Sequence, residues 1–531
     1  MHENLFPALS RRRVLGAAVA GAAGLALAAC SGGPPGQSPV EAGDAAPAGP
    51  RKRGGTFRFA PSDFAGTVSM DPQASDSSFA LATALTDTLM GRDHSWRLQP
   101  GLAEEFEPAP GNFRSWTIRV RAGVAFHNGK PLGADDVIHT IRRNLDPKNP
   151  GFSAGLLASI DPNGLTALDK RTVRLELKSP NSQLRDGFAE APTGIVPVGF
   201  DPRNPVGTGP FKYQSFQPEQ RFVGVRNENY WRHDGPYLDS LELIGFSDPI
   251  TARTNALISG QIDGMDRVPA NLSAQVRARG ELALIVSETG AFEFTGMRCD
   301  PGAQFSDNRV RQAFKLMLDR EQMVKTLYAG FGEPGNDIGA WARIDPAVDG
   351  SIPQRRQDLD RAKWLLKSAG MEGMRVTYRV GQVEPSAMST ATLMVEYAKA
   401  IGVEATIEPV QNLSSFYGPE YFSSQLKNSY DYTQSLYDNA SYCWLPTGGF
   451  NGEHFDHPKV NSLFAQAMNT TGGKYEELMH ELSRVIHEEG PWLVWGRHNI
   501  PDAYRKKFTG ARKDASGLGF NGFRWDEISL A

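Results

Sequence analysis

The sequence predicts a mixed α/β fold built from two or more lobes. Short segments alternate apolar and polar residues, amphipathic helical segments lie between them, and one stretch has the pattern of strand, helix and strand in succession. After its N-terminal segment the chain has about 480 residues, which is too long for one hydrophobic core. No internal repeat is visible.

The first expected strands and helices lie in the N-terminal half and the middle of the chain. Residues 116–121 and 172–177 carry apolar side chains at every second position, as in a strand with one buried face. Residues 134–145 and 359–369 instead repeat apolar residues with helical spacing. Gly370 suits the C-terminal end of the second helix, because glycine adopts left-handed backbone conformations easily.

One strand–helix–strand unit is especially clear. Residues 376–380 alternate as a strand, residues 388–398 follow helical spacing, and residues 403–407 alternate again after Gly402. Two strands joined by a helix pair in parallel through a right-handed crossover. This unit therefore predicts part of a sheet that contains parallel strands.

The N-terminus has the pattern of an export signal with a lipid-attachment cysteine. Three arginines, residues 11–13, precede a short apolar segment rich in alanine and glycine, residues 14–29. The last residues of this segment and the cysteine after it read Leu27-Ala28-Ala29-Cys30. The apolar segment is too short to span a bilayer stably. The paired arginines resemble a twin-arginine signal, and the ending resembles a lipobox. We expect a signal peptide over residues 1–29 and a lipid on Cys30.

A flexible linker is expected from residue 30 to residue 53, because this segment is rich in Gly, Pro, Ala and Ser and poor in large apolar residues. The folded part would begin near residue 54. Together these features place the protein outside the cytoplasm, in the periplasm or at the cell surface, anchored to the membrane by lipid.

The charge balance argues against nucleic-acid binding. The whole chain has a formal net charge of -4, and residues 1–29 carry three arginines and one glutamate, so removal of the signal would leave -6. A nucleic-acid-binding protein needs a basic face. Small solutes or peptides remain as partners, and we expect the protein to act as a monomer.

Signatures of catalysis, metal binding and cofactor binding are absent from the sequence. There is no Gly-x-Ser-x-Gly elbow, His-Glu-x-x-His motif, phosphate-binding loop or Cys-x-x-Cys pair. We expect no enzyme activity, no cofactor and no metal. His454 and His457 do not share a helical face, so a solvated loop is favoured over a metal site. Cys299 and Cys443 are left after lipidation, either paired or as two separate thiols.

Aromatic residues gather in one span of the C-terminal half. Aromatic rings with polar tips are common in ligand pockets, where the rings stack and the hydroxyl groups orient the ligand. The span therefore predicts a pocket, although ordinary loop packing explains any single ring equally well. Its members are Phe416, Tyr417, Tyr421, Phe422, Tyr430, Tyr432, Tyr437, Tyr442, Trp444 and Phe450.

Several segments, taken in order, resemble the extracellular solute-binding proteins of the dipeptide/oligopeptide/nickel-binding family, family 5. The longest is WTIRVRAGVAFHNGKPLGADDV at residues 116–137. Each segment alone is weak, but together they span nearly everything after residue 54. The others are residues 102–104 (LAE), 144–147 (NLDP), 205–211 (PVGTGPF), 226–231 (RNENYW), 260–264 (GQIDG), 310–314 (VRQAF) and 319–320 (DR).

The resemblance implies a two-lobe, Venus-flytrap architecture of the large cluster C type. Lobe I would comprise residues 54–292 and 491–531, and lobe II residues 293–490. Such a protein captures a peptide or another small polar solute between its lobes and delivers it to an ABC transporter permease. Burial of the ligand on both sides lets binding drive closure.

The resemblance also implies a ligand-binding residue. Peptide binders of the family hold the α-amine with an aspartate a few residues after a tryptophan, and Asp438 matches this aspartate. Ser435 stands at the tryptophan position, which leaves open a structural role for Asp438 as a carboxylate that caps backbone N–H groups. The expected ligand-binding residues are Asp438, Tyr437, Asn439, Tyr432, Tyr442 and Trp444.

Two other functions stay open from the sequence alone. An exported hydrolase acting on carbohydrates or peptides would need two carboxylates facing one bond, and Asp431 and Asp438 are candidates. A surface sensor without a transport role is the second alternative.

Overall fold

The computed structural model describes residues 51–64, 68–74, 77–232, 234–246, 251–411 and 413–531. The expected signal peptide, Cys30 and the expected linker up to residue 50 lie outside the described residues. Within the described part, no helix is long and apolar enough to cross a membrane.

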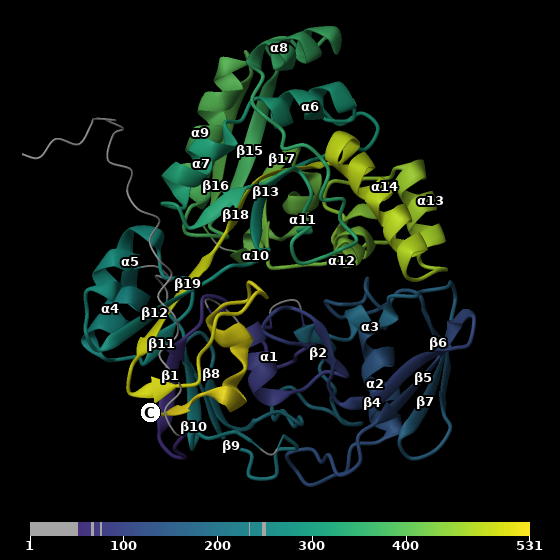
Figure 1. Ribbon diagram of the computed structural model, residues 1–531, viewed down its shortest axis with the longest axis vertical. Helices are drawn as coiled ribbons and strands as arrows, with labels where there is room; N and C mark the ends of the chain where they lie inside the picture. Colours follow the sequence, from purple (N-terminus) through teal and green to yellow (C-terminus); the bar gives the residue numbers. More distant parts are fainter. Residues whose placement is uncertain (1–50, 65–67, 75–76, 233, 247–250, 412) are drawn as a thin grey trace, which may run out of the picture. The chain divides into compact units, whose positions relative to one another are not determined.

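A seven-stranded mixed sheet brings together strands from both ends of the chain (Figure 1). Its central strand β1 pairs in parallel with β10 and β11, and the remaining pairs are antiparallel. The strands lie in the order β12 (Leu282–Ser287), β19 (Ile500–Arg505), β11 (Gly264–Met265), β1 (Thr56–Ala60), β10 (Ser240–Ile244), β9 (Arg221–Arg226) and β8 (Phe211–Gln217).

Alternation along β1 sets the packing of this sheet. Phe57 and Phe59 are fully buried and contact Phe520 from the C-terminal segment, while Phe59 also packs edge-on against Trp525. A smaller core covers a different part of the sheet. Helices α4 (Thr251–Ser259) and α5 (Ala270–Arg277) contribute side chains to it, among them Leu257 of α4. The C-terminal tail is therefore an integral part of the N-terminal sheet.

A separate four-stranded antiparallel sheet follows β1 in the chain. Its order is β4 (Ala103–Ala109), β5 (Asn112–Val120), β7 (Thr172–Leu177) and β6 (Ile160–Ala167). Helix α2 (Ala134–Asn144) packs against it through Val137 and Ile141. Two small ribbons pair β2 (Met90–Arg92) with β3 (Leu98–Pro100), and β20 (Phe508–Thr509) with β21 (Ser529–Leu530).

A six-stranded mixed sheet forms the other major layer. The strands lie in the order β14 (Gly332–Pro334), β18 (Trp492–His498), β13 (Phe292–Met297), β17 (Leu426–Asp431), β15 (Arg375–Gly381) and β16 (Glu404–Val410). Strand β15 pairs in parallel with both β16 and β17.

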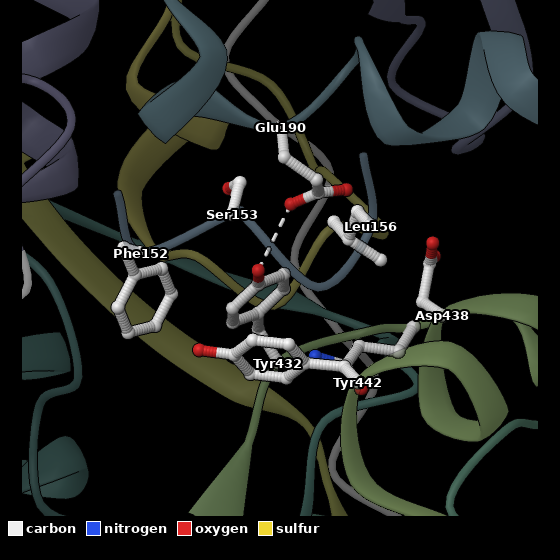
Figure 2. A pocket seen from close by; sticks show the side chains of 8 residues that line it. Phe152, Ser153, Leu156, Glu190, Tyr432, Asp438 and Tyr442 are labelled. Carbon is white, nitrogen blue, oxygen red and sulfur yellow. Dashed lines mark hydrogen bonds between the residues drawn. The ribbon is translucent and has the colours of Figure 1, made fainter. Parts of the chain in front are cut away.

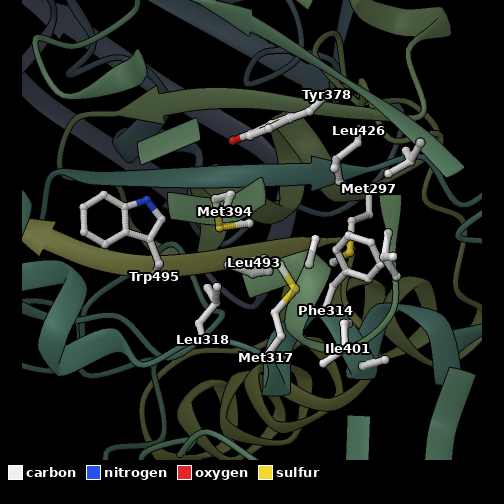
Figure 3. Packing of buried hydrophobic residues seen from close by; sticks show 14 of the residues in the cluster. Met297, Phe314, Met317, Leu318, Tyr378, Met394, Ile401, Leu426, Leu493 and Trp495 are labelled. Atoms are coloured by element: carbon white, nitrogen blue, oxygen red, sulfur yellow. The ribbon is translucent and has the colours of Figure 1, made fainter. Parts of the chain in front are cut away.

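Helices cover both faces of the six-stranded sheet (Figure 1), and β18 alternates between two cores. Leu493 and Trp495 belong to the core shown in Figure 3, which includes residues of helices α6 (Asn308–Leu316), α7 (Arg320–Leu327), α8 (Leu359–Ser368) and α9 (Ala387–Ala400). Trp492 and Val494 belong to the core on the other face, with helices α12 (Leu436–Asn439), α13 (Pro458–Ala467) and α14 (Gly473–Glu489).

Short helical segments complete the described chain. The α-helices are α1 (Phe79–Leu85), α3 (Leu184–Gly187), α10 (Leu413–Phe416) and α11 (Pro419–Ser423). Three further segments are 3₁₀ helices, η1 (Ala191–Thr193), η3 (Phe520–Phe523) and η4 (Trp525–Glu527), and η2 (Ala440–Trp444) is a π-helix.

The elements expected from periodicity are confirmed. The strand expected at residues 172–177 coincides with β7, and helices α2 and α8 begin at the expected residues. The strand–helix–strand unit appears as β15, α9 and β16, with the two strands paired in parallel. Gly370 has a φ of 70° directly after α8, as a C-terminal stop requires.

The chain passes between the seven-stranded and the six-stranded sheet twice, between β12 and β13 and between β18 and β19. The two connections lie side by side, because the His498 N–H donates to the Ala291 carbonyl at 3.1 Å and Thr289 donates to the His498 carbonyl at 2.9 Å. The expected division into residues 54–292 plus 491–531 and residues 293–490 stays a prediction; strand β18, just beyond residue 490, pairs within the six-stranded sheet.

Two of the segments that carry the family resemblance meet around Asp87, which follows α1. The Asp87 carboxylate accepts hydrogen bonds from Thr208, Tyr230 and Trp231 at 2.9, 2.9 and 3.0 Å. The Gly209 N–H donates to the Leu85 carbonyl at the end of α1. Residues 205–211 and 226–231 therefore have a structural role here, and Gly207 packs directly against the end of α1.

We expect Gly207→Ala to destabilise the protein by about 1–3 kcal/mol, the usual range for overpacking. A Cβ at this position would overlap the Leu85 carbonyl oxygen, which is backbone and cannot move aside freely. Chemical denaturation checks the effect. Gly280→Ala is the matched control, because a Cβ there meets nothing within 4 Å. Equal stability of the two variants would contradict the packing argument.

Candidate functional site

Two adjoining cavities make up the candidate ligand site. The first has a volume of about 10 Å³, and its walls come from residues 152–190 and from the segment after β17 (Figure 2). The second has a volume of about 140 Å³ and shares Glu190 and Tyr432 with the first. The first cavity is lined by Phe152, Ser153, Leu156, Glu190, Tyr432, Gln434, Asp438 and Tyr442.

The local fold of the segment after β17 fixes Asp438. Ser435 is the N-cap of helix α12: its hydroxyl accepts from the Asp438 N–H at 3.0 Å and donates to Asp438 Oδ2 at 2.7 Å. Asp438 Oδ2 also accepts from the Ser435 N–H at 3.1 Å. This reciprocal capping box holds the start of a one-turn helix. One oxygen of Asp438 thus has the structural capping role that the sequence left open.

The other oxygen of Asp438 is unoccupied by the protein. Asp438 is only 3% exposed, and within the described part of the chain its Oδ1 is buried without a hydrogen-bond partner. A buried carboxylate oxygen without a donor lowers stability relative to a solvated one. The residue therefore carries one structural oxygen and one oxygen that is free for a ligand.

Arg92 lies against three carboxylates at the edge of this site. Its Nη2 is 3.1 Å from Asp186 Oδ1 and 3.7 Å from Asp438 Oδ2, and its Nε is 4.0 Å from Glu190 Oε1. The guanidinium also lies over the Trp96 ring, 3.7 Å from its centroid. Burial alone would lower the pKa of Arg92, but the neighbouring carboxylates outweigh it and raise the pKa.

The carboxylates of the first cavity hold their protons unusually well. Burial, followed by the charge of Glu190, raises the pKa of Asp438 to about 7, against the opposing effect of Arg92. Burial likewise raises the pKa of Glu190, whose Oε2 accepts a hydrogen bond from the Tyr432 hydroxyl at 2.9 Å. Asp431 lines neither cavity, but it precedes Tyr432 in the chain and accepts from Gln434, and burial raises its pKa as well. A nearby positive charge would favour ionisation of all three groups.

The second cavity combines apolar rings with charged groups that are already paired. Trp96 and Phe523 are buried in its wall. Arg232 lies 3.5 Å from Asp526. Tyr230 and nearby carboxylates raise the pKa of Arg232 against the effect of burial, and burial raises the pKa of Asp526. Thr83, Thr86 and Thr88 add hydroxyl groups to the lining. This space suits the body of a small polar ligand.

The structure brings some of the expected site residues together and places others in the core. Asp438, Tyr432 and Tyr442 line the first cavity. Tyr437 is buried, where it accepts from Asn181 and donates to the Leu156 carbonyl. Asn439 donates to Gln434, and Trp444 packs edge-on against Trp492 in the core. These last three residues do not line either cavity.

Other rings of the aromatic span pack with one another. Phe416, Tyr417, Tyr421 and Phe450 form ring contacts with centroids 4.9 to 5.8 Å apart. For these rings ordinary packing explains the aromatic content. The residues that sequence reasoning missed are Arg92, Glu190, Phe152 and Gln434. Arg92 ends strand β2, Glu190 and Phe152 lie in connecting segments, and all three stand hundreds of positions before Asp438, where no local pattern marks them.

Cysteine and histidine add no ligand chemistry in the described part of the chain. Cys299 and Cys443 are free thiols. Among the described residues, no group of three or more His, Cys, Asp or Glu side chains is arranged to hold a metal ion. His454 Nε2 donates to the Phe422 carbonyl, and His457 lies beside Glu489, so the two histidines have separate partners.

Solved structures share this fold. The periplasmic binding protein AgaA from A. tumefaciens R10, in complex with agropinic acid, has a TM-score of 0.80 at 23% identity, over 90% of this chain and 99% of that one. DppA from Helicobacter pylori, in complex with the peptide STSA, has a TM-score of 0.78 at 20% identity, over 90% and 98%. The molecule thus has the mixed α/β fold of periplasmic binding proteins of the cluster C type, as the sequence predicted.

The family follows from the sequence match. Residues 97–448 match the bacterial extracellular solute-binding proteins, family 5, in their middle region, and the chain belongs to this family. The glutathione-binding protein GsiB of Pectobacterium atrosepticum is 24% identical over 474 residues, 83% of this chain and 89% of that protein. GsiB of Salmonella typhimurium is 25% identical over 474 residues, with the same coverage. The family consists of solute-binding proteins and not enzymes, which supports the expected absence of catalysis.

We expect Asp438→Asn to change how stability depends on pH. The folded state holds a proton on Asp438 that the unfolded state loses between pH 3.8 and about 7, so this group lowers folding stability as pH rises through that range. Asparagine does not titrate. The melting temperature of the variant, relative to the native protein, should therefore be higher at about pH 8 than at about pH 5.

Thermal melts of the unliganded proteins at both pH values test this expectation. Asp201→Asn is the control, because the exposed Asp201 has a pKa lowered by its hydrogen bond to Arg203 and stays ionised at both pH values. A difference between Asp438→Asn and the native protein that does not vary with pH would contradict the raised pKa.

Proposed function

We propose that this protein is the solute-binding receptor of an ABC importer. It captures a peptide or another small polar solute and delivers it to the permease. The family assignment supports the binding role. DppA from Helicobacter pylori is described as an ABC transporter-associated periplasmic binding protein, which supports the link to an importer.

The observation that carries the proposal is the origin of the first cavity. One wall comes from residues 152–190, which precede both crossings between the two large sheets, and the other comes from residues 432–442, which lie between those crossings. A ligand held there would contact both parts of the chain at once. A ligand that binds both walls stabilises the conformation in which they meet.

The lobes of the proposed receptor follow the predicted division, with one adjustment. Lobe I comprises residues 54–292 with the C-terminal tail, and lobe II the residues between. Because β18 pairs with β13 and β14, we assign Trp492–His498 to lobe II and begin the tail at Asn499. The site residues are Asp438, Tyr432 and Tyr442 from lobe II, with Glu190 and Arg92 from lobe I.

Ligand binding should make the protein more compact. Native mass spectrometry of protein purified without denaturation should reveal a bound small molecule, which is then identified. Small-angle scattering of the stripped protein should give a larger radius of gyration than the same sample with that molecule restored. A stripped protein with an unchanged radius at saturating ligand, or purified protein that never carries or binds a small molecule, would count against a receptor.

We also propose that the receptor is exported by the twin-arginine signal over residues 1–29 and anchored by lipid on Cys30. Cys30→Ala should move the protein from the membrane fraction to the soluble fraction, because lipid attachment needs the thiol. Cys299→Ala is the matched control and should stay with the membrane, since this thiol belongs to the folded part. Membrane association of the Cys30→Ala protein would reject the anchor.

A further inference from the structure

We infer that His94 is a positioning residue of the candidate site: bonded at both ring nitrogens to carboxylates of the C-terminal tail, it fixes part of the wall of the second cavity, and it does so in a pH-dependent manner. The residues that His94 would position are Arg92 and Trp96 of the β2–β3 ribbon. The inference rests on the proposed function, because the second cavity is taken as part of the solute site.

Two segments that are far apart in the sequence build much of the wall of the second cavity. The β2–β3 ribbon contributes Arg92 and Trp96, and the C-terminal tail contributes side chains from residues 516–526. His94 lies in the turn of the ribbon, between Arg92 and Trp96. A side chain that joins this turn to the tail therefore joins two parts of one cavity wall.

His94 donates a hydrogen bond from each ring nitrogen to the tail. Its Nδ1 is 2.9 Å from Asp514 Oδ2, and its Nε2 is 3.0 Å from Glu527 Oε2. An ionised carboxylate can only accept, so both bonds need a proton on the nitrogen. The ring that satisfies both is the imidazolium. A neutral ring has one N–H group and can keep only one of the two bonds.

Within the described chain, three charged groups of the tail face His94. Two are the carboxylates of Asp514 and Glu527, and the third is the guanidinium of Arg524, which pairs with Asp514 and has its Nη1 3.2 Å from His94 Nδ1. Asp93, in the same turn, accepts from two backbone N–H groups of the ribbon. Burial, the largest effect, would lower the pKa of His94, and so would the charge of Arg524. The two carboxylate bonds outweigh both and raise the pKa.

The ribbon and the tail each hold an aromatic residue in an unfavourable backbone conformation. Trp96 has a φ of 65° and Phe523 a φ of 54°, and both side chains line the second cavity. Positive φ is strained for residues of this size and persists only where surrounding contacts enforce it. The bonds of His94 are such contacts, because they join the turn before Trp96 to the tail on both sides of Phe523.

Further bonds extend this link to Arg92. Arg524 donates to the Arg92 carbonyl at 2.6 Å, and the Ala515 N–H donates to the His94 carbonyl at 2.9 Å. The Arg92 guanidinium in turn lies 3.7 Å from Asp438 Oδ2 in the first cavity. Loss of the two bonds from the His94 ring would therefore loosen a side chain that reaches the other part of the site.

The direction of the pH effect follows from the raised pKa. In a loosened ribbon His94 titrates near its ordinary value of 6.5, whereas in the ribbon bonded to the tail it keeps its proton to higher pH. The bonds of His94 therefore stabilise the ribbon fully below pH 6.5. This contribution is lost as pH rises through the raised pKa of the bonded state.

The first test is the titration of His94 in the full-length protein without added solute. Histidine rings labelled with carbon-13 give separate NMR signals, and the signal that is missing from His94→Gln belongs to His94. Its midpoint should lie above pH 6.5. A midpoint at or below this value would overturn the inference, because the imidazolium would then gain nothing from its two carboxylates.

Hydrogen exchange measured by mass spectrometry tests the positioning itself. After correction for the intrinsic effect of pH, peptides covering residues 90–100 and 513–527 should exchange about tenfold faster at about pH 9 than at about pH 6, the factor that a charge-assisted hydrogen bond is worth. Peptides from β15, in the six-stranded sheet, should show no such change. An equal exchange rate of the ribbon at both pH values would overturn the inference.

Matched variants assign the effect to His94. Glutamine can donate to only one of the two carboxylates and does not titrate, so His94→Gln should exchange at the faster rate at both pH values. A pH effect that arises from Asp438 would persist in this variant and would overturn the inference. His480→Gln is the control, because the exposed His480 bonds to the Pro346 carbonyl elsewhere and should keep the native profile.

A second variant serves if melting temperatures show that His94→Gln does not fold. Glu527→Gln keeps the imidazole and its bond to Asp514 but removes one of the two negative charges. The ribbon should then loosen at a lower pH than in the native protein, because one cause of the raised pKa is gone. An unchanged pH profile of this variant would overturn the inference.

Native mass spectrometry connects the ribbon to the solute. The fraction of protein that keeps its co-purified small molecule after dialysis should be smaller at about pH 9 than at about pH 6, and His94→Gln should not show this difference. Equal dependence on pH in both proteins would reject the role of His94 and leave the receptor standing. Failure of the proposed function looks different, because the purified protein would then neither carry nor bind a small molecule at any pH.

Discussion

The hydrogen bonds to the Asp87 carboxylate are the constraint on which the arrangement of the site depends. Thr208, Tyr230 and Trp231 come from two separate segments, and all three donate to this one half-buried side chain. The Asp87 carbonyl accepts from the Ile195 N–H as well. A carboxylate with several fixed donors is rigid, since each donor restricts its rotation. Asp87 stands between α1 and β2, so this network fixes the strand that carries Arg92 and the segment that carries Glu190.

The candidate site combines a structural role and an unpaired acceptor in one side chain. Asp438 caps its own helix with one oxygen and presents the other to the cavity. Such sharing holds the free oxygen in place, because the capping bonds prevent the carboxyl group from rotating away. It also explains why Ser435 at this position is compatible with a binding role for Asp438: the serine supplies the cap. The same cap makes the stability of α12 sensitive to substitutions at either residue.

Sequence reasoning succeeded where a local pattern has one physical cause. Alternation predicted β7 because one face of the strand is buried, and helical spacing predicted α2 and α8 for the same reason. The candidate site depends instead on distant segments. Arg92, Glu190 and Phe152 are ordinary residues in their local sequence, and only folding brings them to Asp438. Trp444 and Tyr437 carried the same aromatic signal as Tyr432 and Tyr442. Tyr432 precedes α12, however, and side chains of the short helical segments α12 and η2 face different sides.

The late position of two interior strands determines when this protein can fold during synthesis. Strand β18 lies between β14 and β13, and β19 lies between β12 and β11, yet both are made from residues 492–505 of a chain of 531. Neither large sheet can be completed until residues 492–505 have left the ribosome. Contacts between residues far apart in sequence also form slowly, because a long loop must close first. A chain truncated before β18 would therefore lack interior strands of both large sheets at once.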